Sequence, residues 1–305
     1  MPSETDQTAA MSPKELSRRV RQIGSEINFE TLNATRELYT PLHPVAPFAG
    51  VEIRRDERYG SHERHRLDLF LPEEGTSRPR PALVFIHGGG FVRGDKHSPG
   101  SPFYDNVGVW AVRNGMIGVN MTHRLAPDFQ WPAVIRDVAQ AVAWVNRHGR
   151  EYGLDADRIY LMGQSAGAAH AASYIAHPGI YAPASHGLSG AIFLSGLYNL
   201  ETLAADEMTA SYFGSDRARR RERSPLSGLL AARIPCLIAL AEREPPLFER
   251  QALDLLTALH ERDQRLPPFV HLLGQNHLSG ILHLGLAGDR LGPAILDFMD
   301  SLQER

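Results

Sequence analysis

Ser165 lies at the centre of the segment Gly-Gln-Ser-Ala-Gly at positions 163–167, after an apolar run and before a stretch of small residues. A serine in this G-x-S-x-G pattern, between a strand and a helix, is held on a sharp turn with its hydroxyl exposed. The N-terminus of the following helix favours negative charge that develops beside it. The pattern therefore predicts that Ser165 is a nucleophile. A serine that only caps the helix is the competing interpretation.

A second glycine-rich segment, His-Gly-Gly-Gly-Phe at positions 87–91, follows another apolar run. Attack on a carbonyl creates a tetrahedral oxyanion, which preorganised backbone N–H groups can stabilise. Glycines allow the backbone to approach that oxygen closely. We therefore expect Gly88, Gly89 and the N–H of Ala166 to form an oxyanion hole, with His87 ordering the loop and taking no part in the reaction.

A serine nucleophile needs a general base, and the chain has fourteen histidines from which to supply it. In the fold to which the G-x-S-x-G turn belongs, the chain order is serine, acid, histidine, so we look for the base after the last predicted strand. His277 lies in such a loop, at positions 274–280, whereas His271 lies inside the preceding strand and His283 lies beyond the loop. The order predicts His277 as the base and the other two as structural residues.

The acid that orients this base should follow the strand at 236–240. Two carboxylates are available there, Glu242 and Glu244. Glu244 lies further into the loop and precedes Pro245 and Pro246, which would make the loop rigid. We favour Glu244 as the acid, and Glu242 stays open as the alternative.

Strands and helices alternate along most of the chain, which predicts an α/β fold with a mainly parallel sheet covered by helices on both faces. Helical patterns cover 12–40, 132–149, 166–176, 246–261 and 288–303, and a helical insertion is expected at 198–229. Short apolar or alternating runs predict eight strands, at 51–54, 67–71, 82–86, 116–121, 158–162, 191–194, 236–240 and 269–273.

These motifs, together with Arg-Leu-Ala-Pro at 124–127 and Asn-His at 276–277, resemble the hormone-sensitive-lipase-like branch of the α/β hydrolases. Within this branch the chain is similar to carboxylesterases and to kynurenine formamidase-like (arylformamidase-like) enzymes. The resemblance covers about 50–300 and aligns the acid loop of its relatives with 241–246, which places the acid on Glu244. It implies an α/β-hydrolase fold in one domain, 1–305, with a cap built from 1–45 and from the insertion at 198–229. Dimers are common in the branch, so a homodimer is also an expectation.

The residues of the substrate pocket are harder to predict than the triad, because the pocket walls come from the cap, whose segments the sequence places only coarsely. We expect aromatic and sulfur-containing side chains near the motifs to line it, although each could equally be core. The candidates are Phe91, Trp131, Met208, Tyr212 and Phe213.

The composition excludes several function classes. A net charge of −3 gives no electrostatic basis for binding nucleic acid or an anionic membrane, and no apolar run is long enough to span a bilayer. The single cysteine, Cys236, cannot form an intrachain disulfide, and the polar N-terminus does not resemble a secretion signal, so we expect a cytoplasmic protein. The motifs require no metal and no cofactor, and 88–90 lacks the Lys-Ser/Thr of a phosphate loop.

The sequence therefore predicts a serine esterase that cleaves carboxylic esters of small to medium acyl groups through an acyl-enzyme. Hydrolysis of an aryl amide or formamide is an alternative, since both reactions pass through the same tetrahedral state. A non-catalytic receptor built on the same fold is a further alternative, which the presence of serine, acid and histidine disfavours.

Overall fold

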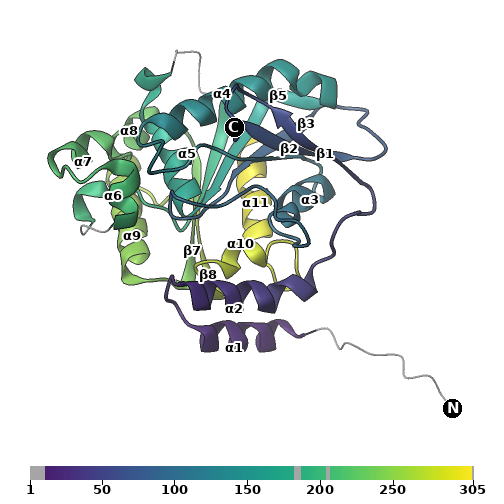
Figure 1. The fold of residues 1–305 in the computed structure, drawn as a ribbon, viewed down its shortest axis with the longest axis horizontal. Helices are drawn as coiled ribbons and strands as arrows, with labels where there is room; N and C mark the ends of the chain where they lie inside the picture. The colour runs from purple at the N-terminus through teal and green to yellow at the C-terminus, as the bar shows by residue number, and fades with distance from the viewer. Residues whose placement is uncertain (1–10, 182–186, 204–206, 304–305) are drawn as a thin grey trace.

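An eight-stranded sheet runs through the computed structural model, which describes residues 11–181, 187–203 and 207–303 (Figure 1). The strand order is β1-β2-β4-β3-β5-β6-β7-β8; β2 pairs antiparallel with β1 and β4, and every later pairing is parallel. This confirms the predicted fold class. The strands are β1 Val51–Arg58, β2 Arg66–Pro72, β3 Arg80–Ile86, β4 Ile117–Met121, β5 Leu154–Gln164, β6 Leu188–Leu194, β7 Cys236–Arg243 and β8 Phe269–Asn276.

The central strands are buried on both faces, as their continuous apolar runs predict. Successive side chains point to opposite faces of a sheet. In β3, Val84 and Ile86 belong to one hydrophobic core, while Leu83 and Phe85 belong to the core on the other face. The sheet is thus the middle layer between two cores, each closed by helices.

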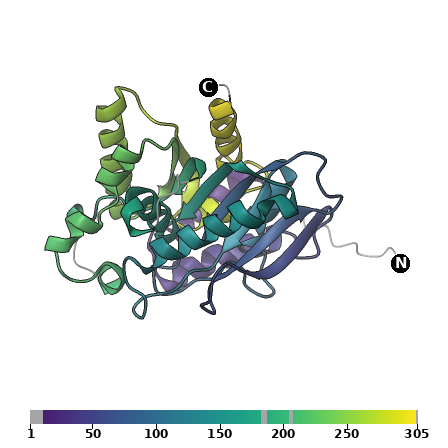
Figure 2. The same ribbon diagram turned by 90° about the horizontal axis from the view of Figure 1, so that it is seen from above.

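Helices cover both faces (Figures 1 and 2). One core is closed by α4 Ala133–His148, α5 Ala166–Ala176, α8 Leu226–Ala232 and α9 Pro246–Asp263; the other is closed by α1 Pro13–Ile23, α3 Asp105–Arg113, α10 Ser279–Leu282 and α11 Leu291–Gln303. In the predicted insertion, α6 Glu207–Phe213 and α7 Ala218–Arg223 precede α8. Short 3₁₀ turns lie at Thr40–Leu42, Gly149–Tyr152, Pro178–Ile180 and Leu200–Thr202.

The predicted helix at 12–40 is in fact two helices, α1 and α2 Phe29–Tyr39, which lie side by side next to α10 and β8 (Figure 1). Gly24 ends α1 with a φ of 98°, a conformation that favours glycine. Asn28 then begins α2, because its Oδ1 accepts a hydrogen bond from the Thr31 N–H at 2.9 Å. The first ten residues of the predicted cap, and 204–206 of the insertion, lie outside the described residues.

Helix α3 is absent from the sequence prediction. Eight of its nine residues are buried, including Asp105 and Asn106, so the segment lacks the polar face that gives a helix its periodic signature. Gly108 packs so closely on Phe70 that a Cβ there would lie 2.1 Å from the Phe70 ring. Among the described residues, no helix combines the length and apolarity needed to cross a membrane.

The residues predicted to take part in the reaction lie at one edge of this sheet. β3, β5, β7 and β8 run parallel, so their carboxyl ends face the same way. The loops that follow them carry the segment at 87–91, Ser165, Glu244 and His277. In open α/β sheets, ligands bind in the crevice at this edge.

Candidate active site

Ser165 occupies a strained turn between β5 and α5. Its φ is 56° and its ψ is −122°, and its side chain makes no capping bond to α5, which argues against the helix-cap interpretation. The turn needs small neighbours: a Cβ on Gly163 would lie 2.3 Å from the Gly167 carbonyl oxygen, and one on Gly167 would lie 2.1 Å from that of Ile86. The strain holds the hydroxyl clear of the helix and in reach of other groups.

The Ser165 hydroxyl lies 2.9 Å from Nε2 of His277. Two contacts hold this imidazole: the buried Gln164 amide donates to the His277 carbonyl at 3.0 Å, and the Phe248 ring packs on it at 4.3 Å between centroids. Asn276 folds the loop, since its Oδ1 accepts the N–H groups of Leu278 and Ser279 at 3.2 and 2.9 Å. The base is therefore fixed from its backbone and from one ring face.

Glu244 lies behind His277, with Oε2 at 2.6 Å from Nδ1. Because a carboxylate only accepts, Nδ1 carries the proton and Nε2 is left to accept the serine proton. Ser195 donates to the other oxygen, Oε1, so the buried carboxylate is engaged at both atoms. The Ser195 partner was not foreseen from the sequence, and its only signal is a polar residue directly after a buried strand.

Glu242, the alternative acid, points elsewhere. Its carboxylate pairs with Arg21 of α1 at 3.1 Å and accepts the Gly274 N–H at 2.6 Å. These two donors lower the pKa of Glu242, with Arg21 making the larger contribution. Glu242 ties α1 to the start of the base loop, while Glu244 faces the base.

The loop after β3 faces Ser165. A Cβ on Gly88 would lie 3.2 Å from the Ser165 Cβ, and one on Gly89, whose φ is 134°, would lie 2.0 Å from the Arg93 carbonyl oxygen. Only glycine fits both positions. Among the loop hydrogen bonds of the described residues, none uses the N–H of Gly88 or Gly89. Both groups are therefore available to an oxygen atom bound beside Ser165.

His87 is fully buried, with its Nδ1 2.7 Å from the Gly88 carbonyl oxygen. That oxygen can only accept, so Nδ1 carries the proton. The carbonyl and the following N–H of a peptide unit point in opposite directions. Fixing the Gly88 carbonyl on the His87 side therefore directs the Gly89 N–H away from it, and the predicted loop-ordering role has a geometric basis.

Two more buried histidines pack in a row with His87: His123 stacks on its ring, and His170 meets His123 edge-on. The His87 and His123 rings are 4.5 Å apart, and the His123 and His170 rings are 4.7 Å apart. Burial lowers the pKa of all three imidazoles. Both ring nitrogens of His170 lack a hydrogen-bond partner within the described part of the chain. The three imidazoles thus form a buried cluster that begins at the first residue of the segment 87–91.

A cavity of about 440 Å³ opens over Ser165 and His277. Met208 of α6 lines it, as the sequence predicts, and its Sδ lies 2.2 Å from where a Gly90 Cβ would be. Helix α2, which belongs to the predicted cap segment 1–45, supplies one side, although none of its residues was among the predicted pocket residues. Its cavity-facing residues follow helical spacing: Phe29, Leu32, Asn33 and Arg36.

Comparison with known proteins agrees with this arrangement. Residues 67–179 match the profile of the BD-FAE family. A probable isoprenylcysteine alpha-carbonyl methylesterase of Arabidopsis thaliana is 37% identical over 123 residues, which cover 40% of this chain and 25% of that protein. The esterase LipI of Mycobacterium tuberculosis is 40% identical over 92 residues, covering 30% and 28%. The chain thus aligns with only about a quarter of the length of these relatives.

Solved structures agree over nearly the whole chain. Esterase B of Lactobacillus rhamnosis superposes with a TM-score of 0.75 at 17% identity, covering 95% of this chain and 96% of that one. An esterase of the archaeon Pyrobaculum calidifontis gives 0.67 at 22% identity, covering 96% and 98%. The chain is an α/β hydrolase by fold. The matches also confirm the predicted resemblance to the carboxylesterase branch.

Most of the predicted pocket residues do not reach the cavity over Ser165. Phe91 has a φ of 70° and turns its ring into the core, where it stacks on Tyr212 at 5.2 Å and meets Phe213 edge-on. Both partners are buried, and Trp131 packs against the same core. These four predictions are corrected: Tyr212 and Phe213 are buried residues of α6, Phe91 and Trp131 pack in the same core, and only Met208 of the set lines the cavity.

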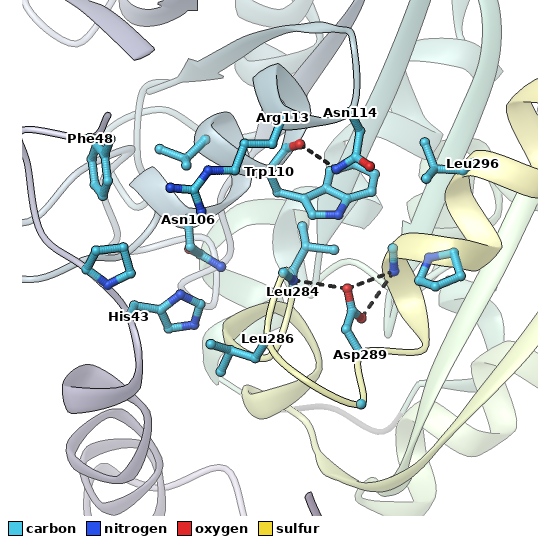
Figure 3. Close-up of a pocket in the computed structure, with 16 residues that line it drawn as sticks. His43, Phe48, Asn106, Trp110, Arg113, Asn114, Leu284, Leu286, Asp289 and Leu296 are labelled. Atoms are coloured by element: carbon cyan, nitrogen blue, oxygen red, sulfur yellow. Dashed lines mark hydrogen bonds between the residues drawn. The ribbon is translucent and has the colours of Figure 1, made fainter. Parts of the chain in front are cut away.

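The protein has a second cavity, of about 370 Å³, between α3 and the segment 284–296 (Figure 3). Its carboxylate, Asp289, is occupied by the N–H groups of Gly285, Leu291 and Gly292. The cavity brings no nucleophile into contact with a base among its lining residues. Its chemistry is therefore distinct from that of the cavity over Ser165.

Proposed function

We propose that this protein is a serine carboxylesterase that cleaves small to medium acyl esters through an acyl-enzyme, with Ser165, His277 and Glu244 as its catalytic triad. The observation that carries the proposal is the continuous chain of contacts from Ser165 Oγ through the His277 imidazole to Glu244, at 2.9 and 2.6 Å. Such a chain beside a glycine-rich oxyanion loop is the arrangement that nucleophilic acyl transfer requires.

The reaction begins when Ser165 Oγ attacks the ester carbonyl and His277 Nε2 takes its proton. Glu244 holds the imidazole in the tautomer that can accept this proton and stabilises the imidazolium that forms. The N–H groups of Gly88, Gly89 and Ala166 bind the oxyanion. His277 then protonates the leaving alcohol, and a water molecule activated by the same base hydrolyses the acyl-enzyme.

The preference for short acyl groups is supported by the size of the cavity and by the relatives. A volume of about 440 Å³ suits a small ligand, and its walls include Phe29, Met208 and Phe248. The relatives named above are esterases or methylesterases, and esterase B was also crystallised with a tributyrin phosphonate inhibitor.

The proposal extends to the domain organisation of the protein and to its location in the cell. The catalytic core at 50–300 and the cap segments at 1–45 and 198–229 form one domain, in which α2 and α6 both border the cavity. The protein acts in the cytoplasm on a small-molecule ester. If it is a homodimer, gel filtration at working concentration gives twice the chain mass of 33.8 kDa.

Wild type and Ser165→Ala should be compared on p-nitrophenyl butyrate and on N-formylkynurenine. Fast ester cleavage that is lost in the variant, with little formamide turnover, supports the carboxylesterase. Preferred turnover of the formamide would replace it with the amidase alternative. Without turnover of either, and without fluorophosphonate labelling of Ser165, the triad assignment fails and the receptor alternative replaces it.

A further inference from the structure

Two arginines, Arg36 and Arg93, line the same cavity as Ser165 and His277. Both are exposed, and no carboxylate of the described residues lies within ion-pair distance of either guanidinium. By contrast, Arg21 forms an ion pair with the carboxylate of Glu242. Within the part of the chain that the structure describes, the cavity thus holds two positive charges without a counterion.

Arg36 is held beside the cavity because α2 is anchored through the face next to its cavity-lining side. The Thr35 hydroxyl accepts a hydrogen bond from the Asn276 amide at 3.0 Å, and the Tyr39 hydroxyl donates to the Gln275 side chain at 2.9 Å. Both partners lie at the end of β8, immediately before His277. Leu32 and Arg36, one turn apart, are consequently turned toward the cavity.

Arg93 is held against the oxyanion loop. Its N–H donates to the Gly89 carbonyl at 3.2 Å, and its own carbonyl is in close contact with the Gly89 Cα. Asp95 also lines the cavity, but its carboxylate is engaged elsewhere: Oδ1 accepts the Lys96 N–H at 2.7 Å, and Oδ2 lies 3.7 Å from Arg64. The local acid therefore does not neutralise Arg93.

We propose, building on the esterase function above, that Arg36 and Arg93 bind an ionised acidic group of the substrate, so that esters carrying a carboxylate are the preferred class. A guanidinium presents a planar fork of donors that matches a carboxylate. Arg36 belongs to the α2 wall of the cavity and Arg93 to the loop after β3. The contacts therefore select the substrate and leave the acyl-transfer steps as described.

Two matched pairs of esters test this, each containing a carboxylate and its neutral amide. One pair, 4-butyryloxybenzoate and 4-butyryloxybenzamide, carries the charge on the alcohol side. The other, the p-nitrophenyl monoesters of adipic acid and of adipic acid monoamide, carries it on the acyl side. The measurements are kcat and KM for wild type, Arg36→Gln, Arg93→Gln, Arg36→Lys and a control, Arg113→Gln, which removes an exposed arginine outside the cavity.

In at least one pair, wild type should favour the carboxylate at least about tenfold in kcat/KM, the order expected for a charge-assisted hydrogen bond. Arg36→Gln and Arg93→Gln should each lower this ratio about tenfold, mainly through KM, because the contact is the same in ground and transition states. Arg36→Lys should keep part of the preference. Arg113→Gln should keep all of it, and about 0.5 M salt should weaken it.

The proposal is overturned if the ratio of kcat/KM for the carboxylate ester to that for its neutral amide is near one in wild type for both pairs, or if neither glutamine variant changes it. Ser165-dependent turnover of the neutral esters would then still uphold the esterase function. If none of the four esters is turned over in a Ser165-dependent way, the esterase function itself fails, and the substrate class fails with it. The two failures are therefore distinguishable in one set of assays.

Discussion

The Ser195 hydroxyl donates a hydrogen bond to Oε1 of Glu244, while Oε2 of the same carboxylate faces His277. Ser195 directly follows β6 and has a φ of 51°. Glu244 follows β7, and Ser195 follows the neighbouring strand β6. The Ser195 hydrogen bond therefore holds the carboxylate of the flexible Glu244 side chain in the orientation that faces His277.

Removing the Ser195 hydroxyl should make the Glu244 carboxylate more mobile while leaving it in place beside His277. We expect Ser195→Ala to lower kcat about tenfold, equal to about 1.4 kcal/mol of transition-state stabilisation, with little change in KM. Ser195→Gly, which suits the positive φ and also lacks the hydroxyl, separates backbone strain from the lost hydrogen bond. Steady-state kinetics on a butyrate ester measure both. Equal kcat in wild type and Ser195→Gly would show that the hydroxyl does not matter.

The two candidate acids should respond differently to the same substitution. Glu244→Gln should lower kcat about 10³–10⁴-fold, because an amide cannot hold the imidazole in its working tautomer or stabilise its charge. Glu242→Gln should keep kcat within about threefold and lower the free energy of unfolding by up to about 1 kcal/mol, since it weakens an exposed ion pair to Arg21. Kinetics and urea titration distinguish them, and a reversed pattern would reassign the acid.

His87 should act on the reaction through the Gly88 peptide. His87→Ala frees the Gly88 carbonyl and lets the Gly89 N–H turn away, so kcat should fall about 10²–10³-fold, the amount that one oxyanion donor supplies. His87→Asn offers an amide donor near the position of Nδ1 and should recover part of the loss. If the asparagine variant is as slow as the alanine variant while both remain folded by circular dichroism, the orienting hydrogen bond is not the cause.

The buried histidines should make stability depend on pH. Burial lowers the folded-state pKa of His170 below its unfolded value of about 6.5. Below that pH the unfolded chain binds a proton that the folded chain excludes, so stability present at neutral pH is lost on acidification. Each such histidine contributes up to about 1.4 kcal/mol per pH unit in that window.

His170→Phe keeps an aromatic ring against Phe91 and Tyr212 and removes the titrating group. Urea unfolding between pH 7 and pH 5 should therefore show a smaller loss of stability in this variant than in wild type. The exposed His260→Gln is the control and should follow wild type. A loss of stability as steep in His170→Phe as in wild type would contradict the assignment.

The sequence predicts the sheet well because buried parallel strands are short apolar runs, and all eight appear in the structure. It also predicts which segments carry the chemistry, since a strand followed by a glycine-rich turn is a local pattern. The placements of Ser165, His277 and Glu244 relative to one another follow from strand order, which the alternation of elements implies.

The cavity walls were not predictable in this way, because they depend on side-chain direction. Phe91 belongs to a motif that borders the site, yet its positive φ sends the ring into the core. Helix α2 docks through Thr35 and Tyr39, whose hydroxyls bind partners at the end of β8. A stripe of threonine and tyrosine does not look like a buried face, so periodicity alone could not orient the helix.

The separate anchoring of α2 has a consequence for how such an enzyme diversifies. The residues that line the cavity from α2 lie before the first strand, far along the chain from Ser165, Glu244 and His277. The anchoring side chains are distinct from the lining ones. One part of the substrate selectivity is thus encoded in a stretch of the gene apart from the codons for the triad. A combinatorial library restricted to codons 29, 32, 33 and 36 should change which substrates are accepted and leave the reaction chemistry intact.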